Sequence, residues 1–262
     1  MSRKRTLPSC AYFFSAAIAF LTLSLLDVRA GDTAPISLFD GKTLNGWKVV
    51  CIPEDKEKQF WSVKDGAIQC DSRGKSKHNY NWLIYQKEFD DFELRFKVQC
   101  YRSSKGNSGV QIRSRWSPDT GKGSLNGPQI DIHPPAPYRT GFIYDSTHGV
   151  RHWISPVRPS HRLTEKQAFP SGKPKGWKFH YATENQNLWN SMTIRAVGTR
   201  ITTYLNGTLI TDYDGSGVLD DKIHQDAKVG MKGFIALQLH SGDQLLIRFK
   251  DITVLPLREK SH

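Results

Sequence analysis

The chain has few cysteines, and none of them is arranged for a structural metal site. It contains four cysteines in 262 residues, and Cys51, Cys70 and Cys100 are the three beyond the first thirty positions. None shows the paired Cys-x-x-Cys spacing of a structural zinc site. In an exported protein two of them could oxidise to a disulfide and leave one over, and the sequence does not say which pair. The cysteines therefore do not define the fold.

Long stretches with helical periodicity are also missing. Short runs of β-branched and aromatic residues recur instead, separated by Gly and Asn turns, which is typical of a sandwich or barrel rather than of alternating strands and helices. Asn206-Gly207 joins two of these runs and is the preferred two-residue hairpin turn, because both positions tolerate positive φ. The clearest expected strands span 60–63, 67–70, 92–101, 108–116, 128–133, 141–145, 189–196, 200–205, 208–213, 233–240 and 244–255.

Positive charge is abundant but not clustered. The chain has 37 Lys and Arg against 25 Asp and Glu, a net charge of +12, but no basic run with interleaved aromatics on a recognisable nucleic-acid module. We therefore expect no nucleic-acid partner. The sequence does not define the oligomeric state.

Residues 1–30 show the pattern of a secretory signal peptide. A basic start precedes an apolar run, and the small-residue stop Val28-Arg29-Ala30 follows. The apolar run is only marginally long enough for a membrane span, so a retained N-terminal anchor is the alternative. We expect a secreted or periplasmic protein with no stable membrane span after signal cleavage.

Residues 31–262 are expected to form one all-β domain, since sandwiches of this length are often single domains and can bury their own core. The alternation of apolar and polar residues fails between 151 and 187, which predicts a long loop insertion. This insertion is rich in Lys and Arg and also contains Trp153 and Trp177. We expect it to be an ordered flap over or beside the functional face, with a peripheral loop as the alternative.

The residues best suited to chemistry lie on the polar faces of three expected strands. In the stretch 127–135, Ile130 and Ile132 point to one face and the intervening polar side chains to the other. Strands 108–116 and 233–240 alternate in the same way. The alternative is that these polar side chains have no function and form a solvated face whose charges pair with neighbouring strands. If the three strands are neighbours, one sheet presents a hydrogen-bonding surface made of Gln111, Arg113, Arg115, Gln129, Asp131, His133, Gln238 and His240.

A series of short motifs runs in order along the chain. It includes Asn107-Ser-Gly-Val-Gln-Ile-Arg113, Gln129-Ile-Asp131, Thr140-Gly-Phe-Ile-Tyr144 and Leu205-Asn-Gly207. In these motifs the chain resembles the secreted 3-keto-disaccharide hydrolase family over nearly all of 31–262. The resemblance implies a concanavalin A-like jelly roll of two antiparallel sheets with the ligand site on the concave face. It also implies that the motif from Leu38 to Trp47 tucks the N-terminal strand onto the core and carries no chemistry.

The resemblance implies an enzyme that cleaves 3-keto-glycosides, a 3-keto-glucoside 1,2-lyase and 3-keto-2-hydroxy-glucal hydratase, with net hydrolysis. A ketone at C3 acidifies the proton at C2, so such a site needs a base, an oxyanion stabiliser, an acid for the leaving oxygen and groups that bind hydroxyls. Many members carry an acidic residue just before the Gln-x-Asp segment, where this chain has Pro128. A non-catalytic carbohydrate-binding module on the same scaffold is therefore the alternative.

Candidates for the catalytic roles come from the polar strand faces and from one motif tyrosine. Asp131 or His133 is the candidate base, since a histidine has a suitable pKa. Arg113 is the candidate cation for the enolate, although it could simply pair with Asp131. Tyr144 or His240 is the candidate proton donor.

The hydroxyl-binding candidates are Asn107, Gln129 and Gln238. A divalent cation held by Asp131 and His133 could act as a Lewis acid on the ketone. Two ligands do not define a metal site, so no cofactor is certain.

Overall fold

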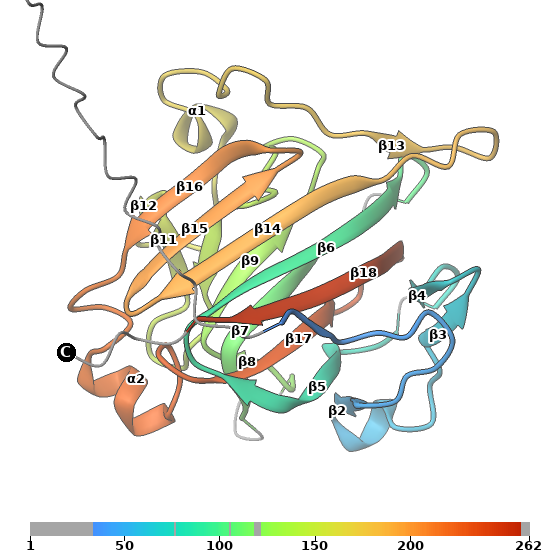
Figure 1. Ribbon diagram of the computed structural model, residues 1–262, viewed down its shortest axis with the longest axis horizontal. Coiled ribbons are helices and arrows are strands. Elements are labelled where there is room, and N and C mark those ends of the chain that lie inside the picture. Colours follow the sequence, from blue (N-terminus) through green and yellow to red (C-terminus); the bar gives the residue numbers. More distant parts are fainter. Residues whose placement is uncertain (1–33, 76, 105, 118–121, 258–262) are drawn as a thin grey trace, which may run out of the picture.

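Two β-sheets pack face to face and form the body of the molecule (Figure 1). The computed structural model describes residues 34–75, 77–104, 106–117 and 122–257. The expected signal peptide at 1–30 lies outside these residues. Within them, no helix has the length and hydrophobicity needed to cross a bilayer.

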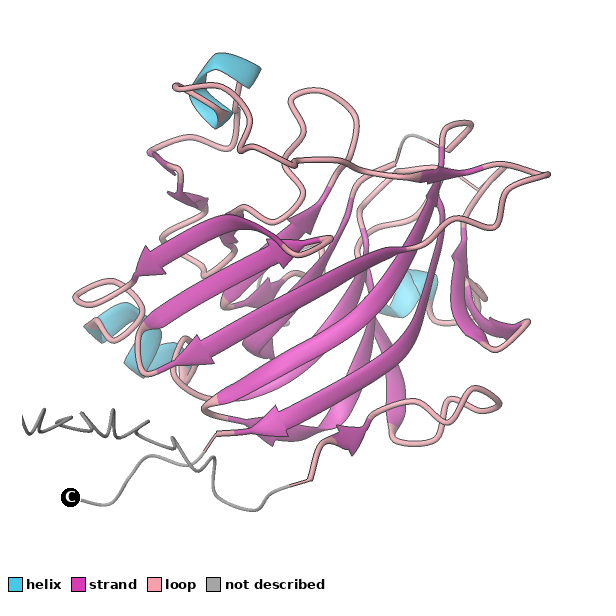
Figure 2. Ribbon diagram, turned by 45° about the horizontal axis from the view of Figure 1, so that its top comes forward, coloured by secondary structure: helices cyan, strands magenta, loops and turns pink. Residues whose placement is uncertain are grey.

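The first sheet, sheet A, carries the long central strands seen from the front in Figure 2. Its pairings are antiparallel except that β13 (Tyr181–Ala182) pairs in parallel with β6. The short strand β1 (Ile36–Ser37) pairs antiparallel with β18. Its main order is β16 (Thr208–Asp214), β15 (Arg200–Leu205), β14 (Asn190–Val197), β6 (Phe92–Tyr101), β18 (Leu246–Pro256), β4 (Ala67–Asp71) and β3 (Trp61–Lys64).

The second sheet, sheet B, is antiparallel and carries the strands that position the candidate site. A short strand β8 (Leu125–Asn126) pairs with β7. Its main order is β12 (Val157–Arg158), β11 (His152–Ser155), β10 (Ile143–Asp145), β9 (Pro128–Ile132), β7 (Ser108–Trp116), β17 (Gly233–Leu239), β5 (Asn81–Phe89) and β2 (Trp47–Cys51). Helical structure among the described residues is limited to α1 (Glu165–Ala168), α2 (Lys222–Ala227) and a 3-10 turn at Pro53–Asp55.

The expected jelly-roll sandwich is confirmed by the two packed sheets. Every strand expected from the sequence is present to within two residues at each end. Alternation is clearest in β6, where Phe92, Leu94 and Phe96 are buried in the core between the sheets. In the expected hairpin, Leu205 pairs with Thr208 across the Asn-Gly turn. The N-terminal motif also packs as expected, since Trp47 donates its indole N–H to the Leu38 carbonyl at 2.7 Å.

Strands β2 and β5 of sheet B are among those that were not expected from the sequence. In β5, Trp82 and Leu83 are adjacent and both buried, Leu83 in the central core and Trp82 in a small cluster with Leu125 on the other face of sheet B. A strand buried on both faces has no polar–apolar alternation. The pattern that revealed the other strands was therefore absent here.

The segment 151–187 is ordered, and the expectation that it contains no strand was wrong. Strands β11 and β12 extend sheet B beyond β10, and α1 begins with a capping box between Thr164 and Gln167. Trp153 and Phe169 pack with Phe142 in a second small core. The segment is therefore held in place by the cap of α1 and by packing against the edge of sheet B, neither of which can be predicted from strand alternation.

Strands β9, β7 and β17 are neighbours, as the shared polar face required. Ile130 and Ile132 enter the core between the sheets, so Gln129 and Asp131 lie on the face of sheet B turned away from sheet A. This outer face holds the candidate site.

Candidate active site

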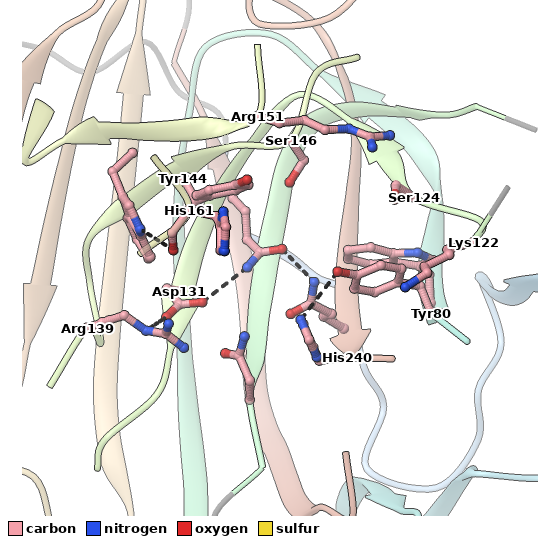
Figure 3. Close-up of a pocket in the computed structure, with 15 residues that line it drawn as sticks. Tyr80, Lys122, Ser124, Asp131, Arg139, Tyr144, Ser146, Arg151, His161 and His240 are labelled. Carbon is pink, nitrogen blue, oxygen red and sulfur yellow. Dashed lines mark hydrogen bonds and ion pairs between the residues drawn. The ribbon is translucent and has the colours of Figure 1, made fainter. Parts of the chain in front are cut away.

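A cavity of about 690 Å³ lies on the outer face of sheet B (Figure 3). Its volume is in the range of ligand-binding pockets. The segment 151–187 contributes to its wall, as expected for a flap beside the polar face. The lining residues are Tyr80, Trp82, Asn107, Lys122, Ser124, Gln129, Asp131, Arg139, Tyr144, Ser146, Arg151, Trp153, His161, Gln238 and His240.

A chain of hydrogen bonds crosses the floor of the cavity. Gln238 on β17 donates its Nε2 to Oε1 of Gln129 on β9 at 2.6 Å, and Gln129 donates its Nε2 to Oδ1 of Asp131 at 3.2 Å. Strand β7 lies between β17 and β9. The two glutamines meet across it because Gly109 has no side chain, and a Cβ there would lie 2.8 Å from Gln129.

Asp131 is buried, and its charge partner is Arg139. Nε of Arg139 lies 3.0 Å from Oδ2 of Asp131, and the pair is drawn in Figure 3. Burial raises the pKa of Asp131, and the Arg139 guanidinium is the strongest influence in the opposite direction. The guanidinium also lies 5.5 Å above the Trp153 ring, which holds the cation in place.

A second acid–base group faces the cavity from the residue before β5, Tyr80, and the residue after β17, His240. Nε2 of His240 lies 3.3 Å from the Tyr80 hydroxyl, and Nδ1 lies 3.3 Å from Oδ2 of Asp243. Burial acts to raise the pKa of Asp243, but its hydrogen bonds with His240 and with the Asn107 backbone N–H outweigh burial and lower the pKa. The Asp243 carboxylate therefore orients His240, a common arrangement around acid–base histidines.

Protonated hydroxyls and free acceptors complete the lining. Burial raises the pKa of Tyr144 to about 12, so its hydroxyl keeps its proton at neutral pH. Oδ1 of Asn107 and Oε1 of Gln238 are buried and have no hydrogen-bond partner within the described part of the chain. Such acceptors are suited to sugar hydroxyls, because buried polar atoms are costly when left unpaired. Tyr80 and Trp82 add stacked rings with centroids 5.9 Å apart.

Six of the eight candidates from the sequence come together in this cavity. His133 is not among the lining residues. It directly follows β9, half-buried, and burial together with the Arg139 charge lowers its pKa. The six that line the cavity are Asn107, Gln129, Asp131, Tyr144, Gln238 and His240.

The expected place of Arg113 on the polar face was wrong. Arg113 has φ of 47° and sits beside a register shift between β7 and β17, so its side chain leaves the regular alternation. It is fully buried, and it donates to Oδ1 of Asp91 at 2.7 Å and to three backbone carbonyls. Its guanidinium holds the fold together and does not reach the cavity.

The expected cation site does not gain further protein ligands. Within the described ranges, no three His, Cys, Asp or Glu side chains gather where they could hold a metal ion. Asp131 is already paired with Arg139, and His133 does not line the cavity. Asp131 and His133 therefore do not fit a divalent cation, and we assign no step to a metal.

Sequence reasoning missed Arg139, Tyr80, Trp82 and His161. Arg139 directly precedes the motif that ends in Tyr144, and this position was its only signal. His161 belongs to the expected flap. Because loop residues have no strand period, nothing in their pattern indicated which of them face the cavity.

Comparisons with known proteins agree with the β-sandwich fold. A 3-keto-disaccharide hydrolase from Bacteroides thetaiotaomicron is 28% identical over 103 residues, which cover 38% of this chain and 34% of that protein. The match thus spans about a third of that relative. A candidate glycosyl hydrolase from Parabacteroides distasonis has a TM-score of 0.52 at 15% identity, covering 86% of this chain and 94% of that one. A protein of unknown function with a galectin-like fold from Bacillus subtilis has a TM-score of 0.50 at 12% identity, covering 82% and 91%.

The fold and the site define the class of the protein as a jelly-roll sandwich with a polar, ligand-sized cavity on the outer face of one sheet. Residues 34–255 match the family model described as the 3-keto-alpha-glucoside-1,2-lyase-like domain. The chain belongs to this family.

Proposed function

We propose that this protein is an exported enzyme that cleaves 3-keto-glycosides by elimination across C1 and C2 followed by hydration. The observation that carries the proposal is the buried Asp131–Arg139 pair, which shares one cavity with the His240–Tyr80 pair. A base with an adjacent cation and a separate proton donor are the groups that this chemistry requires. Export is supported by the signal-like pattern of residues 1–30.

Asp131 acts as the base in this proposal. Its carboxylate takes the C2 proton, and the electron pair of the C–H bond forms an enolate whose charge lies on the C3 oxygen. Arg139 stabilises this oxygen as a fixed cation. We prefer Asp131 to His133 as the base because Asp131 lines the cavity and His133 does not. Asp131 is also the one carboxylate among the described residues that line it.

Elimination then breaks the C1–O bond. The enolate electrons form the C1=C2 double bond and restore the C3 ketone, while His240 or Tyr144 gives a proton to the departing oxygen. Water adds to C1 of the resulting enone and a proton returns to C2, which yields the free 3-keto sugar. Hydroxyls of the ring are bound by Gln238 and Asn107, whose buried acceptors are unpaired.

Turnover of a 3-keto-glucoside tests the proposal. Purified protein should release the free 3-keto sugar, and Asp131→Asn should lower kcat by about 10²- to 10⁴-fold, the usual contribution of a positioned base. Asp251→Asn is the matched control, since this carboxylate is exposed on sheet A. If the folded wild-type protein releases no sugar, the proposal is wrong.

A non-catalytic carbohydrate-binding module is the second candidate. It is favoured by Pro128, which stands where many relatives carry an acid, and by the stacked Tyr80 and Trp82 rings, which suit sugar binding without chemistry. In that case glycan-array binding persists when Asp131 and His133 are both changed to Ala. An enzyme whose base is Asp131 would instead lose turnover in the same variant.

A further inference from the structure

One side of the cavity carries cations that the proposed reaction does not use. Lys122 and Arg151 line the cavity, and Figure 3 shows them on the opposite side from Asp131 and Arg139. Asp131, the only carboxylate in the described lining, is already paired with Arg139. The remaining charge of the lining is therefore positive.

Neither cation contacts a carboxylate within the described residues. Some exposed cations elsewhere, such as Arg73 and Arg200, are paired with an Asp, whereas others, such as Arg162, have no ion pair within the described residues either. Their position in the cavity lining, together with the absence of a described carboxylate partner, is what makes Arg151 and Lys122 available to a ligand.

The charge of Arg151 acts on the interior of the cavity. Burial raises the pKa of both Tyr80 and Tyr144, and in both cases the Arg151 guanidinium acts against this rise. Tyr80 directly precedes β5, and Tyr144 lies on β10. The Arg151 charge is therefore near enough to act on both sides of the cavity that it lines.

We propose that the glycoside substrate carries an oxyanion, the carboxylate of a hexuronate or a sulfate ester, on the group attached to C1, and that Arg151 and Lys122 bind it. This inference rests on the proposed function, which places the keto ring at Asp131 and Arg139 and so leaves the opposite side for the leaving group. An Arg fork binds carboxylate and sulfate oxygens through two charge-assisted hydrogen bonds, and a Lys ammonium adds a point charge.

Binding of unoxidised disaccharides tests the inference without any turnover. Calorimetry at low salt would compare a neutral disaccharide with its uronide and its sulfate ester. The anionic ligands should bind about tenfold more tightly or better, the usual effect of one or two charge-assisted hydrogen bonds. The tighter of the two identifies the oxyanion, and added salt should reduce the difference.

Arg151→Gln and Lys122→Gln should each reduce this preference, measured as the ratio of the affinity for the anionic ligand to the affinity for the neutral one. Gln keeps a Cβ, so the backbone of Arg151, with φ of 48°, is under the same strain in both proteins. Arg162→Gln is the matched control, an exposed cation in the same segment that does not line the cavity. Its preference should equal that of the wild type.

Equal affinity for neutral and anionic ligands overturns the inference. If neutral 3-keto-glycosides are nevertheless cleaved, the proposed reaction stands without the anion site. A clear anion preference with no cleavage of the 3-keto uronide or sulfate has the opposite meaning, since it overturns the reaction and leaves the anion site in place.

Discussion

At the scale of single residues, the ionisation of Asp131 depends on two opposing features of its surroundings. It is 1% exposed, so desolvation disfavours its carboxylate and raises its pKa, whereas Arg139 opposes this rise. A base must be ionised to take a proton. The ion pair therefore favours the ionised form of Asp131 and also supplies the cation for the enolate.

Arg139→Gln should shift the acidic limb of the kcat/KM profile to higher pH. Without the guanidinium, burial raises the pKa of Asp131 further, so the carboxylate forms only at higher pH. The loss of the cation should also lower kcat by about 10²-fold. The measurement is the pH–rate profile with a 3-keto-glucoside as substrate.

Arg139→Lys should restore part of the original profile, because it returns a cation to the site. Arg95→Gln is the surface control, since this side chain is exposed and pairs with Glu93. An acidic limb that stays at the wild-type pH in Arg139→Gln would contradict this account of Asp131.

Among the elements, α2 is attached to the cavity strand β10 through one buried histidine. Nε2 of His224 lies 2.7 Å from Oδ2 of Asp145, and Nδ1 lies 2.7 Å from Oδ1 of Asp221, the N-cap of α2. Asp145 lies between Tyr144 and Ser146, which both line the cavity. The helix thus positions one wall of the site, although none of its residues reaches the cavity.

The His224 contact should make stability depend on pH. Burial alone would lower the pKa of His224, but the hydrogen bonds and charges of Asp145 and Asp221 outweigh burial and raise it. A histidine whose pKa is raised on folding contributes its full stabilisation below its unfolded pKa of about 6.5. This contribution is lost as the pH rises through the folded pKa.

His224→Ala should therefore lower the free energy of unfolding by about 3 kcal/mol near pH 6, because the buried Asp145 carboxylate loses its cation and keeps only the hydrogen bond from the Thr147 N–H. Thermal or urea unfolding from pH 5 to pH 9 should show the difference from the wild type narrowing at alkaline pH. Lys222→Ala on the same helix removes an exposed pair with Asp226, and should change stability by less than about 0.5 kcal/mol. A difference that is constant with pH would contradict a charged His224.

At the scale of the whole molecule, the sandwich is stabilised by its core and not by disulfides among the described cysteines. Cys51, Cys70 and Cys100 are all free. Cys70 and Cys100 lie on strands to either side of β18, and both are in register with Ile247. Two strand spacings are about 10 Å, beyond the reach of a disulfide.

A reducing agent should therefore leave the melting temperature unchanged. Burial raises the pKa of the Cys70 and Cys100 thiols, so both should react with a thiol reagent only after unfolding. Half-buried Cys51 should react first in the native protein. Counting thiols in a Cys10→Ser background, with and without Cys51→Ser, checks this order, and a lower melting temperature under reduction would contradict it.

Much of the fold follows from local sequence patterns. A strand with one solvent-exposed face can be predicted from its alternation of apolar and polar residues, as in β6 with Phe92 and Leu94. The hairpin is predicted by its Asn-Gly turn. The two-residue period of a strand also predicts that Gln129, Asp131 and Gln238 lie on the polar face of their strands. Residue order along a strand determines face, because successive side chains point to opposite sides.

Only the tertiary structure decided which charges meet. Arg113 left its predicted face because a bulge interrupts the strand period, whereas Arg139 reached Asp131 from a loop that has no period at all. Strand β5 was not predicted because both of its faces are buried, so the adjacent residues Trp82 and Leu83 are both apolar and the alternation is lost. Side-chain direction can be read from the sequence while the ladder is regular, but contacts made by loops, bulges and doubly buried strands depend on segments distant in the chain.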